Sequence, residues 1–180
     1  MKYIIVDLEA TCWDGKGHGK KNEIIEIGAV CINENKQIES QFSEFVKPTM
    51  NPELSEFCMG LTSIRQTDID KADTFDKVIK RFKNWINTDE DYVLCSWGFY
   101  DKNQFIADCN LHKLETDWLK YHISLKHQYT DIKQLKRHTG MSGALYMENL
   151  KLEGIHHRGI DDAKNIAKVF LKQFDQWAFV

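Results

Sequence analysis

Two carboxylates stand at the end of the first apolar run of the sequence. The stretch KYIIVDLE is typical of a buried β-strand, because residues 3–6 form an uninterrupted apolar run and are mostly β-branched. Side chains alternate along a strand, so Asp7 and Glu9 project to the same side. They would repel each other unless a cation lay between them, and such hard oxygen ligands favour Mg²⁺ or Mn²⁺ over zinc. The pair alone is a weak motif, since two acids at a strand end could also simply face solvent.

A third carboxylate follows a later apolar segment. Asp101 comes after the strand-like YVLCSWG and stands at the start of YDKNQFIADCNLH, which we predict to be a helix. Ligand sites of α/β proteins lie at the carboxyl ends of strands, so Asp101 is a candidate for such a site, although helix capping would also explain it. We expect Asp108, two turns further on, to lie at the surface.

A histidine and a fourth carboxylate stand where the last predicted helix begins, in HHRGIDDAKNIA. His157 and Asp162 are separated by Gly159, which allows the loop to fold back before the helix begins. This spacing could place an imidazole and a first-turn carboxylate around one site, with Asp161 left to cap the helix. Histidine is the side chain best suited to exchange a proton near neutral pH, but a histidine beside a helix start can also be structural.

The elements that must position these residues alternate in type. After the first strand come a loop, DGKGHGKK, and a predicted hairpin of EIIEIGAVCIN and QIESQFSEFVKP. The later segments are one or two short helices within 51–70, an amphipathic helix after Thr74, the strand YVLCSWG, the helix at Asp101, a weaker strand HQYTDI, helices in DIKQLKRHTG and SGALYMENL, and a helix over about 161–177. This order predicts a single α/β domain over residues 1–180, with a mixed sheet flanked by helices. The apolar WAFV could dock on another subunit or on the chain's own sheet.

Composition narrows the class of protein. The 180 residues are 42% hydrophobic, which suits a single globular core. The formal net charge is −3, so there is no excess of Lys and Arg that would indicate a nucleic-acid partner. A nucleic acid would have to be held locally, by metal ions, loops or helix ends. The five cysteines show no C-x-x-C spacing, which disfavours a disulfide framework or a zinc ribbon. We find no pattern of a membrane span or signal peptide and expect a cytoplasmic protein.

In chain order, D-x-E, the later Asp101 and H-x-G-x-x-D resemble the three motifs of the DEDDh 3′-to-5′ exonucleases, which have a ribonuclease-H-like fold. The segments DLEATCW, EIIEIGAV, FVKPTMNPELSEFCMGLTSI, SWGFYD and HHRGIDDAKNIA extend the resemblance over almost the whole chain, to the Eri-type subgroup that includes KapD-like proteins. Two positions depart from the pattern. Gly159 stands where the third motif usually has alanine, and Ser63 replaces the glycine of the usual L-T-G-I.

The resemblance implies a sheet of about five strands and a role for each matching residue. Two divalent ions, Mg²⁺ or Mn²⁺, would be held by Asp7, Glu9, Asp101 and Asp162, with His157 as the general base. Ala10 and Thr11 would contact the 3′-terminal sugar. Packing or stacking on the terminal bases would involve Leu8, Phe57, Leu61 and Tyr100, for which ordinary core packing is the alternative. Contacts to phosphates could come from Lys16, Lys20, Lys21 and Arg158.

The activity implied is that of a metal-dependent 3′-to-5′ exonuclease that releases nucleoside monophosphates from single-stranded RNA or RNA 3′ overhangs. Only the Eri-like NPELSEFC segment favours RNA. A DNA exonuclease of the proofreading or repair type would use the same chemistry, and contact with a 2′-hydroxyl would separate the two. A catalytically silent nucleic-acid-binding module is a third hypothesis. Such a module would be free to lose an acid or the histidine, whereas all five positions are present. The sequence identifies no protein partner.

Overall fold

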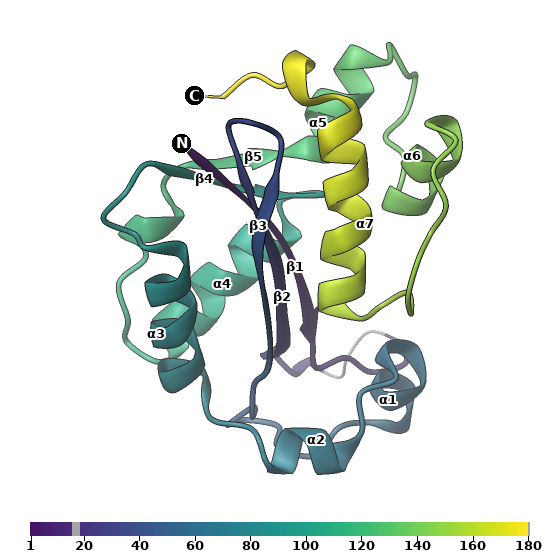
Figure 1. Cartoon of the computed structure of the whole chain (residues 1–180). Coiled ribbons are helices and arrows are strands. Elements are labelled where there is room, and N and C mark those ends of the chain that lie inside the picture. Colours follow the sequence, from purple (N-terminus) through teal and green to yellow (C-terminus); the bar gives the residue numbers. More distant parts are fainter. Residues whose placement is uncertain (16–18, 180) are drawn as a thin grey trace.

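A five-stranded mixed sheet forms the centre of the protein (Figure 1). The computed structural model describes residues 1–15 and 19–179. The strands are β1 (Lys2–Ala10), β2 (Ile24–Asn33), β3 (Ile38–Phe45), β4 (Tyr92–Ser96) and β5 (His122–Ser124), in the spatial order β3-β2-β1-β4-β5. β1 pairs antiparallel with β2 and parallel with β4, and β2 and β3 form the predicted hairpin. The expected mixed sheet of about five strands is confirmed.

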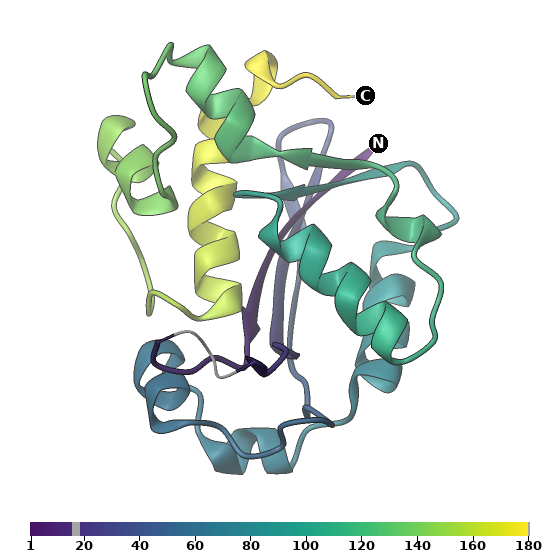
Figure 2. The same ribbon diagram turned by 180° about the vertical axis from the view of Figure 1, so that it is seen from behind.

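Helices cover both faces of this sheet. They are α1 (Glu56–Thr62), α2 (Gln66–Asp70), α3 (Phe75–Ile86), α4 (Tyr100–Leu111), α5 (Leu125–Ile132), α6 (Met141–Met147) and α7 (Gly159–Lys172). α3 and α4 lie on one face, whereas α5, α6 and α7 lie on the other (Figures 1 and 2). α1 and α2 lie beyond the carboxyl end of β1 (Figure 1). None of the described helices is long and apolar enough to cross a membrane.

The central strand is apolar throughout because it is buried from both sides. Ile4 and Val6 pack into the core beneath α3 and α4, whereas Tyr3 and Ile5 pack into the core beneath α7. This double burial explains why the apolar residues of β1 are consecutive rather than alternating. In the core on the α3 side, the predicted amphipathic face is confirmed by the buried residues Phe75, Val78, Ile79, Phe82 and Ile86.

Three predicted elements differ from the structure in type or extent. HQYTDI is not a strand: most of α5 is formed by these residues, and the fifth strand is the three-residue β5 just before it. Leu125 and Tyr129 are both buried at the i, i+4 spacing of one helix face, which decides for helix. DIKQLKRHTG does not form the predicted helix, since α5 already ends at Ile132 and α6 begins only after Gly140. α7 ends at Lys172, and a single 3₁₀ turn follows over Phe174–Gln176.

The segment after α7 folds back on the chain's own sheet. Trp177 is buried, and its ring stacks on Phe170 of α7 with the centroids 5.9 Å apart. The Phe179 ring lies 4.6 Å from that of Tyr3 on β1. The described residues of WAFV therefore pack against the chain's own fold, which is one of the two predicted alternatives. Val180 lies outside the described residues.

Candidate active site

Four carboxylates meet in one cleft at the carboxyl end of β1. The cleft is lined by residues that include Asp7, Glu9, Asp101 and Asp162. Oxygens of Asp7, Glu9 and Asp162 lie within 4.8 Å of one another. Asp7 is half-buried and the other three acids are buried. Residues from three separate motifs are thus brought together, as the family resemblance implies.

Burial and mutual repulsion oppose ionisation of this cluster. Burial raises the pKa of Asp7 well above its usual value, and the charges of Asp101, Glu9 and Asp162 raise it further. Burial is the main cause that raises the pKa of Glu9 to about 8, and repulsion from Glu26 is the next. Four carboxylates in one cleft are therefore unfavourable without compensating cations, and their hard oxygens fit Mg²⁺ or Mn²⁺.

Asp101 is fixed by the backbone of the central strand. It lies in the first turn of α4, which begins four residues after β4 ends. β1 pairs with β4 only from Lys2 to Ile5, and beyond that point the N–H of Leu8 donates to Oδ1 of Asp101 at 3.1 Å. Burial raises the pKa of Asp101 to about 6, and the hydrogen bond from Leu8 limits the rise. The side chain thus links the start of α4 to the strand that carries Asp7 and Glu9.

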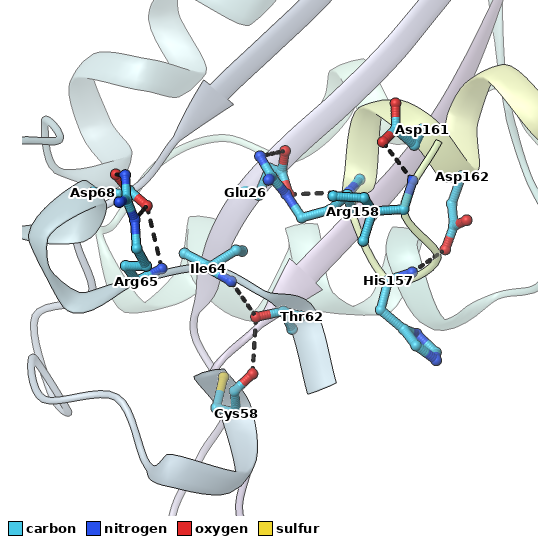
Figure 3. Close-up of polar contacts among 12 residues, drawn as sticks. Glu26, Cys58, Thr62, Ile64, Arg65, Asp68, His157, Arg158, Asp161 and Asp162 are labelled. Carbon is cyan, nitrogen blue, oxygen red and sulfur yellow. Dashed lines mark hydrogen bonds and ion pairs between the residues drawn. The ribbon is translucent and has the colours of Figure 1, made fainter. Parts of the chain in front are cut away.

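Asp162 is held by the turn that precedes it. The backbone N–H of His157, and not its imidazole, donates to Oδ2 of Asp162 at 2.9 Å (Figure 3). His157 has a φ of 64°, a left-handed conformation that is uncommon outside glycine. Burial lowers the pKa of His157, and the neighbouring His156 lowers it further, so the neutral imidazole is favoured. Asp161 accepts from the N–H of Ile155 at 2.9 Å and so secures the loop, whereas Arg158 is the residue at the N-cap of α7.

His156 was not predicted as a site residue. Its Nδ1 lies 2.9 Å from Oδ2 and 3.1 Å from Oδ1 of Asp162. Its ring stacks on that of His157, with 3.9 Å between centroids and 15° between planes. Of the two adjacent histidines in HHRG, the structure therefore places the first beside the carboxylate. The repeated histidine was the only sequence signal for this contact.

Glu26 is a second residue that sequence reasoning missed. It lies on β2 opposite Glu9 and accepts from Nε of Arg158 at 3.1 Å, Nη2 of Arg158 at 3.2 Å and the N–H of Gly159 at 3.0 Å (Figure 3). The Glu26 side chain is 1% exposed and that of Arg158 is 23% exposed. This buried ion pair ties the start of α7 to β2. It also engages the guanidinium that the sequence suggested for phosphate contact.

Glycines allow α7 to approach the sheet at backbone distance. A Cβ added to Gly28 of β2 would lie 2.0 Å from the carbonyl carbon of Gly159. A Cβ on Gly159 would lie 3.0 Å from the carbonyl oxygen of Asp7 and 3.1 Å from the nitrogen of Gly28. The departure from alanine at position 159 therefore gives this chain a close contact between α7 and the strand that carries Asp7.

The residues suggested for nucleotide contact fall into two groups. Leu8, Ala10 and Thr11 are buried at the end of β1, whereas three apolar side chains are exposed, namely Phe57 at 43%, Leu61 at 39% and Tyr100 at 53%. Leu8 and Tyr100 line the same cleft as the acids. The Thr11 hydroxyl accepts from the N–H of Glu23 at 2.9 Å, which links the residue after β1 to the residue before β2.

The remaining charged candidates differ in their surroundings. Lys20 and Lys21 are exposed, and Nζ of Lys20 lies 5.1 Å from the centroid of the Trp13 ring. Lys16 lies outside the described residues. The expectation that Asp108 is at the surface is wrong, because it is buried and accepts from the N–H of Ile24 on β2 at 3.1 Å.

Comparisons with known proteins agree with this geometry. The exonuclease family model matches residues 4–170. The 3′-5′ exoribonuclease 1 of Rattus norvegicus is 33% identical over 177 residues, which are 93% of this chain and 51% of the relative. The 3′-5′ exonuclease eri1 of Schizosaccharomyces pombe is 31% identical over 202 residues, covering 96% of this chain and 68% of the relative. The crystal structure of the nuclease domain of 3′hExo bound to rAMP, described as a DEDDh family member, has a TM-score of 0.93 and 30% identity, covering 99% of this chain and 96% of that domain.

The chain therefore belongs to the DEDDh exonuclease family and has its ribonuclease-H-like fold. Its relatives are of the Eri type, which confirms the resemblance seen in the motifs. The chain spans about half the length of the mammalian exoribonuclease it matches.

Proposed function

We propose that this protein is a metal-dependent 3′-to-5′ exonuclease that shortens RNA and releases nucleoside monophosphates. The observation that carries the proposal is the cluster of Asp7, Glu9 and Asp162, whose oxygens lie within 4.8 Å of one another in an open cleft. Such a cluster is unfavourable for stability alone, and it suits a reaction in which cations offset the charge of a phosphodiester.

All four carboxylates of the cleft would take part in holding the cations. Mg²⁺ or Mn²⁺ ions would be held by Asp7, Glu9, Asp101 and Asp162. When bound, two such ions would supply an activated water molecule and would stabilise charge on the scissile phosphate. The hydrogen bonds from Leu8 to Asp101 and from His157 to Asp162 orient both helix-borne carboxylates before any ion arrives.

His157 is our candidate for the general base. Its lowered pKa favours the neutral imidazole at neutral pH, which is the form able to accept a proton from water. The same turn supplies the backbone N–H that holds Asp162, so the proposed base and one proposed metal ligand are linked by a direct hydrogen bond. We expect activity to fall as the pH drops from about 8 to 5, a range around the reference imidazole pKa. A flat profile would exclude this role for His157.

Exposed apolar side chains support a binding surface for the terminal nucleotides. Phe57 and Leu61 project from α1, and Tyr100 projects from the start of α4. Each residue is at least 39% exposed, so ordinary core packing does not explain its position. Stacking contributes about 1–3 kcal/mol per base and tolerates any base. We therefore propose weak sequence preference, with the backbone of Ala10 and Thr11 close to the 3′-terminal sugar.

RNA is favoured over DNA by the relatives. Those of the Eri type include proteins named exoribonucleases, and the nuclease domain of 3′hExo was solved with rAMP. A DNA exonuclease would share the carboxylate cluster, so the choice of sugar is the part of the proposal that most needs an experiment.

The test incubates matched 5′-labelled RNA and DNA oligonucleotides with Mg²⁺ or Mn²⁺. We expect a ladder that shortens from the 3′ end, faster for RNA, and no shortening in the presence of a chelator. Asp7→Ala should abolish it, whereas Asp89→Ala, an exposed carboxylate outside the cleft, should not. An Asp7→Ala protein as active as the wild type would refute the proposed site, and faster shortening of DNA would refute the choice of substrate.

A further inference from the structure

A second group of metal-binding side chains overlaps the carboxylate cluster. One ligand atom each from His156, His157 and Asp162 lies within 4.8 Å of the other two. Asp162 belongs to both groups, because its oxygens also lie within 4.8 Å of those of Asp7 and Glu9. The two groups differ in chemistry, since one offers only oxygens and the other offers two imidazole nitrogens and one carboxylate.

The nitrogen-rich group suits a different class of ion. Two histidines and a carboxylate are a donor set that Zn²⁺ uses in proteins, with a water molecule in the fourth position, whereas Mg²⁺ prefers oxygen. Tetrahedral Zn²⁺ with ligands at about 2.0–2.1 Å places them about 3.3–3.4 Å apart. Separations of up to 4.8 Å therefore need only small movements of the side chains.

The side chain that must move is free to do so. The His156 side chain is 44% exposed, whereas that of Asp162 is 6% exposed and is fixed by the N–H of His157. The His156 ring already lies against this carboxylate, with Nδ1 at 2.9 Å from Oδ2. For the stacked pair of imidazoles to bind one ion beside the buried carboxylate, the rings must rotate.

We propose that His156, His157 and Asp162 form a site for Zn²⁺ or a similar late transition-metal ion, distinct from the Mg²⁺ or Mn²⁺ cluster but sharing Asp162 with it. Occupancy of this site removes Asp162 from the carboxylate cluster and ties up the imidazole of His157. Zn²⁺ then inhibits the protein instead of activating it. This inhibitory consequence rests on the proposed function, whereas the binding of Zn²⁺ does not.

Binding is measured on the metal-free protein, without RNA. Zn²⁺ is titrated into the chelator-treated chain in competition with a chromogenic Zn²⁺ indicator. We expect one site that becomes at least about tenfold weaker in His156→Ala, by analogy with the 10–100-fold losses seen even for outer-shell partners. His138→Ala is the matched control, because its ring also packs against another histidine, His127, with 4.5 Å between centroids.

Two further variants separate the alternatives. Asp7→Asn should weaken Mn²⁺ binding while the Zn²⁺ site is kept, because Asp7 belongs only to the carboxylate cluster. Unchanged Zn²⁺ affinity in His156→Ala, or an equal loss in Asp7→Asn or His138→Ala, would overturn the proposal. Where RNA is shortened, the Zn²⁺ concentration that halves each variant's own rate should rise at least about tenfold in His156→Ala. If the chain proves not to shorten RNA, the titration still decides whether this site exists.

Discussion

Replacing Gly28 by alanine tests how closely the position of α7 is set by the sheet. The added Cβ would lie 2.0 Å from the carbonyl carbon of Gly159 and 2.1 Å from the nitrogen of Ile160. Both are backbone atoms, so no change of rotamer can relieve the overlap. Ordinary contact begins at 3.4 Å, and the difference from 2.0 Å means that β2 and the start of α7 must separate by about 1.4 Å.

This separation moves Asp162 away from the acids on β1. Asp162 lies in the first turn of α7, whereas Asp7 and Glu9 remain on the central strand. A misplacement of about 1 Å costs about 10²-fold in rate, and we expect Gly28→Ala to shorten RNA at least about 100-fold more slowly. This loss corresponds to about 2.7 kcal/mol in the activation free energy. The free energy of unfolding should fall by about 1–3 kcal/mol as well.

The assay is single-turnover shortening of 5′-labelled RNA at saturating Mg²⁺, on protein whose folding is verified by circular dichroism at the assay temperature. Gly60→Ala is the control, because a Cβ at this position of α1 meets nothing within 4 Å. Alanine also favours a helix over glycine by about 1 kcal/mol, so this variant should be at least as stable as the wild type. A folded Gly28→Ala protein with a rate within about threefold of wild type would refute the reasoning.

The other predictions concern stability. Ser63→Gly should raise the free energy of unfolding in urea by about 0.5–1 kcal/mol, because Ser63 ends α1 at a φ of 59°, and an unchanged value would contradict this. In a chelator the melting temperature should fall as the pH rises from about 5 to 8. Burial raises the pKa of Glu9 to about 8, so the folded state binds this proton more tightly than the unfolded state and loses stability above the unfolded pKa. Mg²⁺ should reverse the fall and Glu9→Gln should reduce it; a melting temperature that rises over this range would be the contrary result. Glu26→Ala should destabilise by about 3–5 kcal/mol, because it leaves the Arg158 guanidinium without its buried partner. Glu44→Ala, which breaks an exposed ion pair, should cost at most about 1 kcal/mol in the same denaturation experiment. Equal losses of stability in Glu26→Ala and Glu44→Ala would contradict the larger contribution expected of the buried pair.

Sequence patterns predicted the parts of the fold that depend on local periodicity. The consecutive apolar residues of β1 and the spacing of the buried face of α3 are local signals, and both elements are present. β5 was misplaced because a strand of three residues carries too little periodicity to be recognised. The motifs identified acids that lie together in the structure, but only the family resemblance predicted that they would.

Contacts between distant segments explain what the sequence could not reveal. Asp108 is expected at the surface, but it is buried and accepts from the N–H of Ile24, which is 84 positions away. The pairing of Glu26 with Arg158 spans 132 positions. The contact of His156 with Asp162 is close in sequence, but it is made across a left-handed turn at His157, a conformation that is uncommon outside glycine.

The order of the site residues along the chain determines when the site can be assembled. Asp7 and Glu9 leave the ribosome early, whereas Asp162 follows only with α7, which must then dock on β1 and β2 through the glycine contact. A nascent chain that has not yet emerged as far as α7 holds an unfinished set of ligands. The carboxylate cluster is thus complete only after α7 has docked on the sheet, so the last step of folding is also the step that assembles the site.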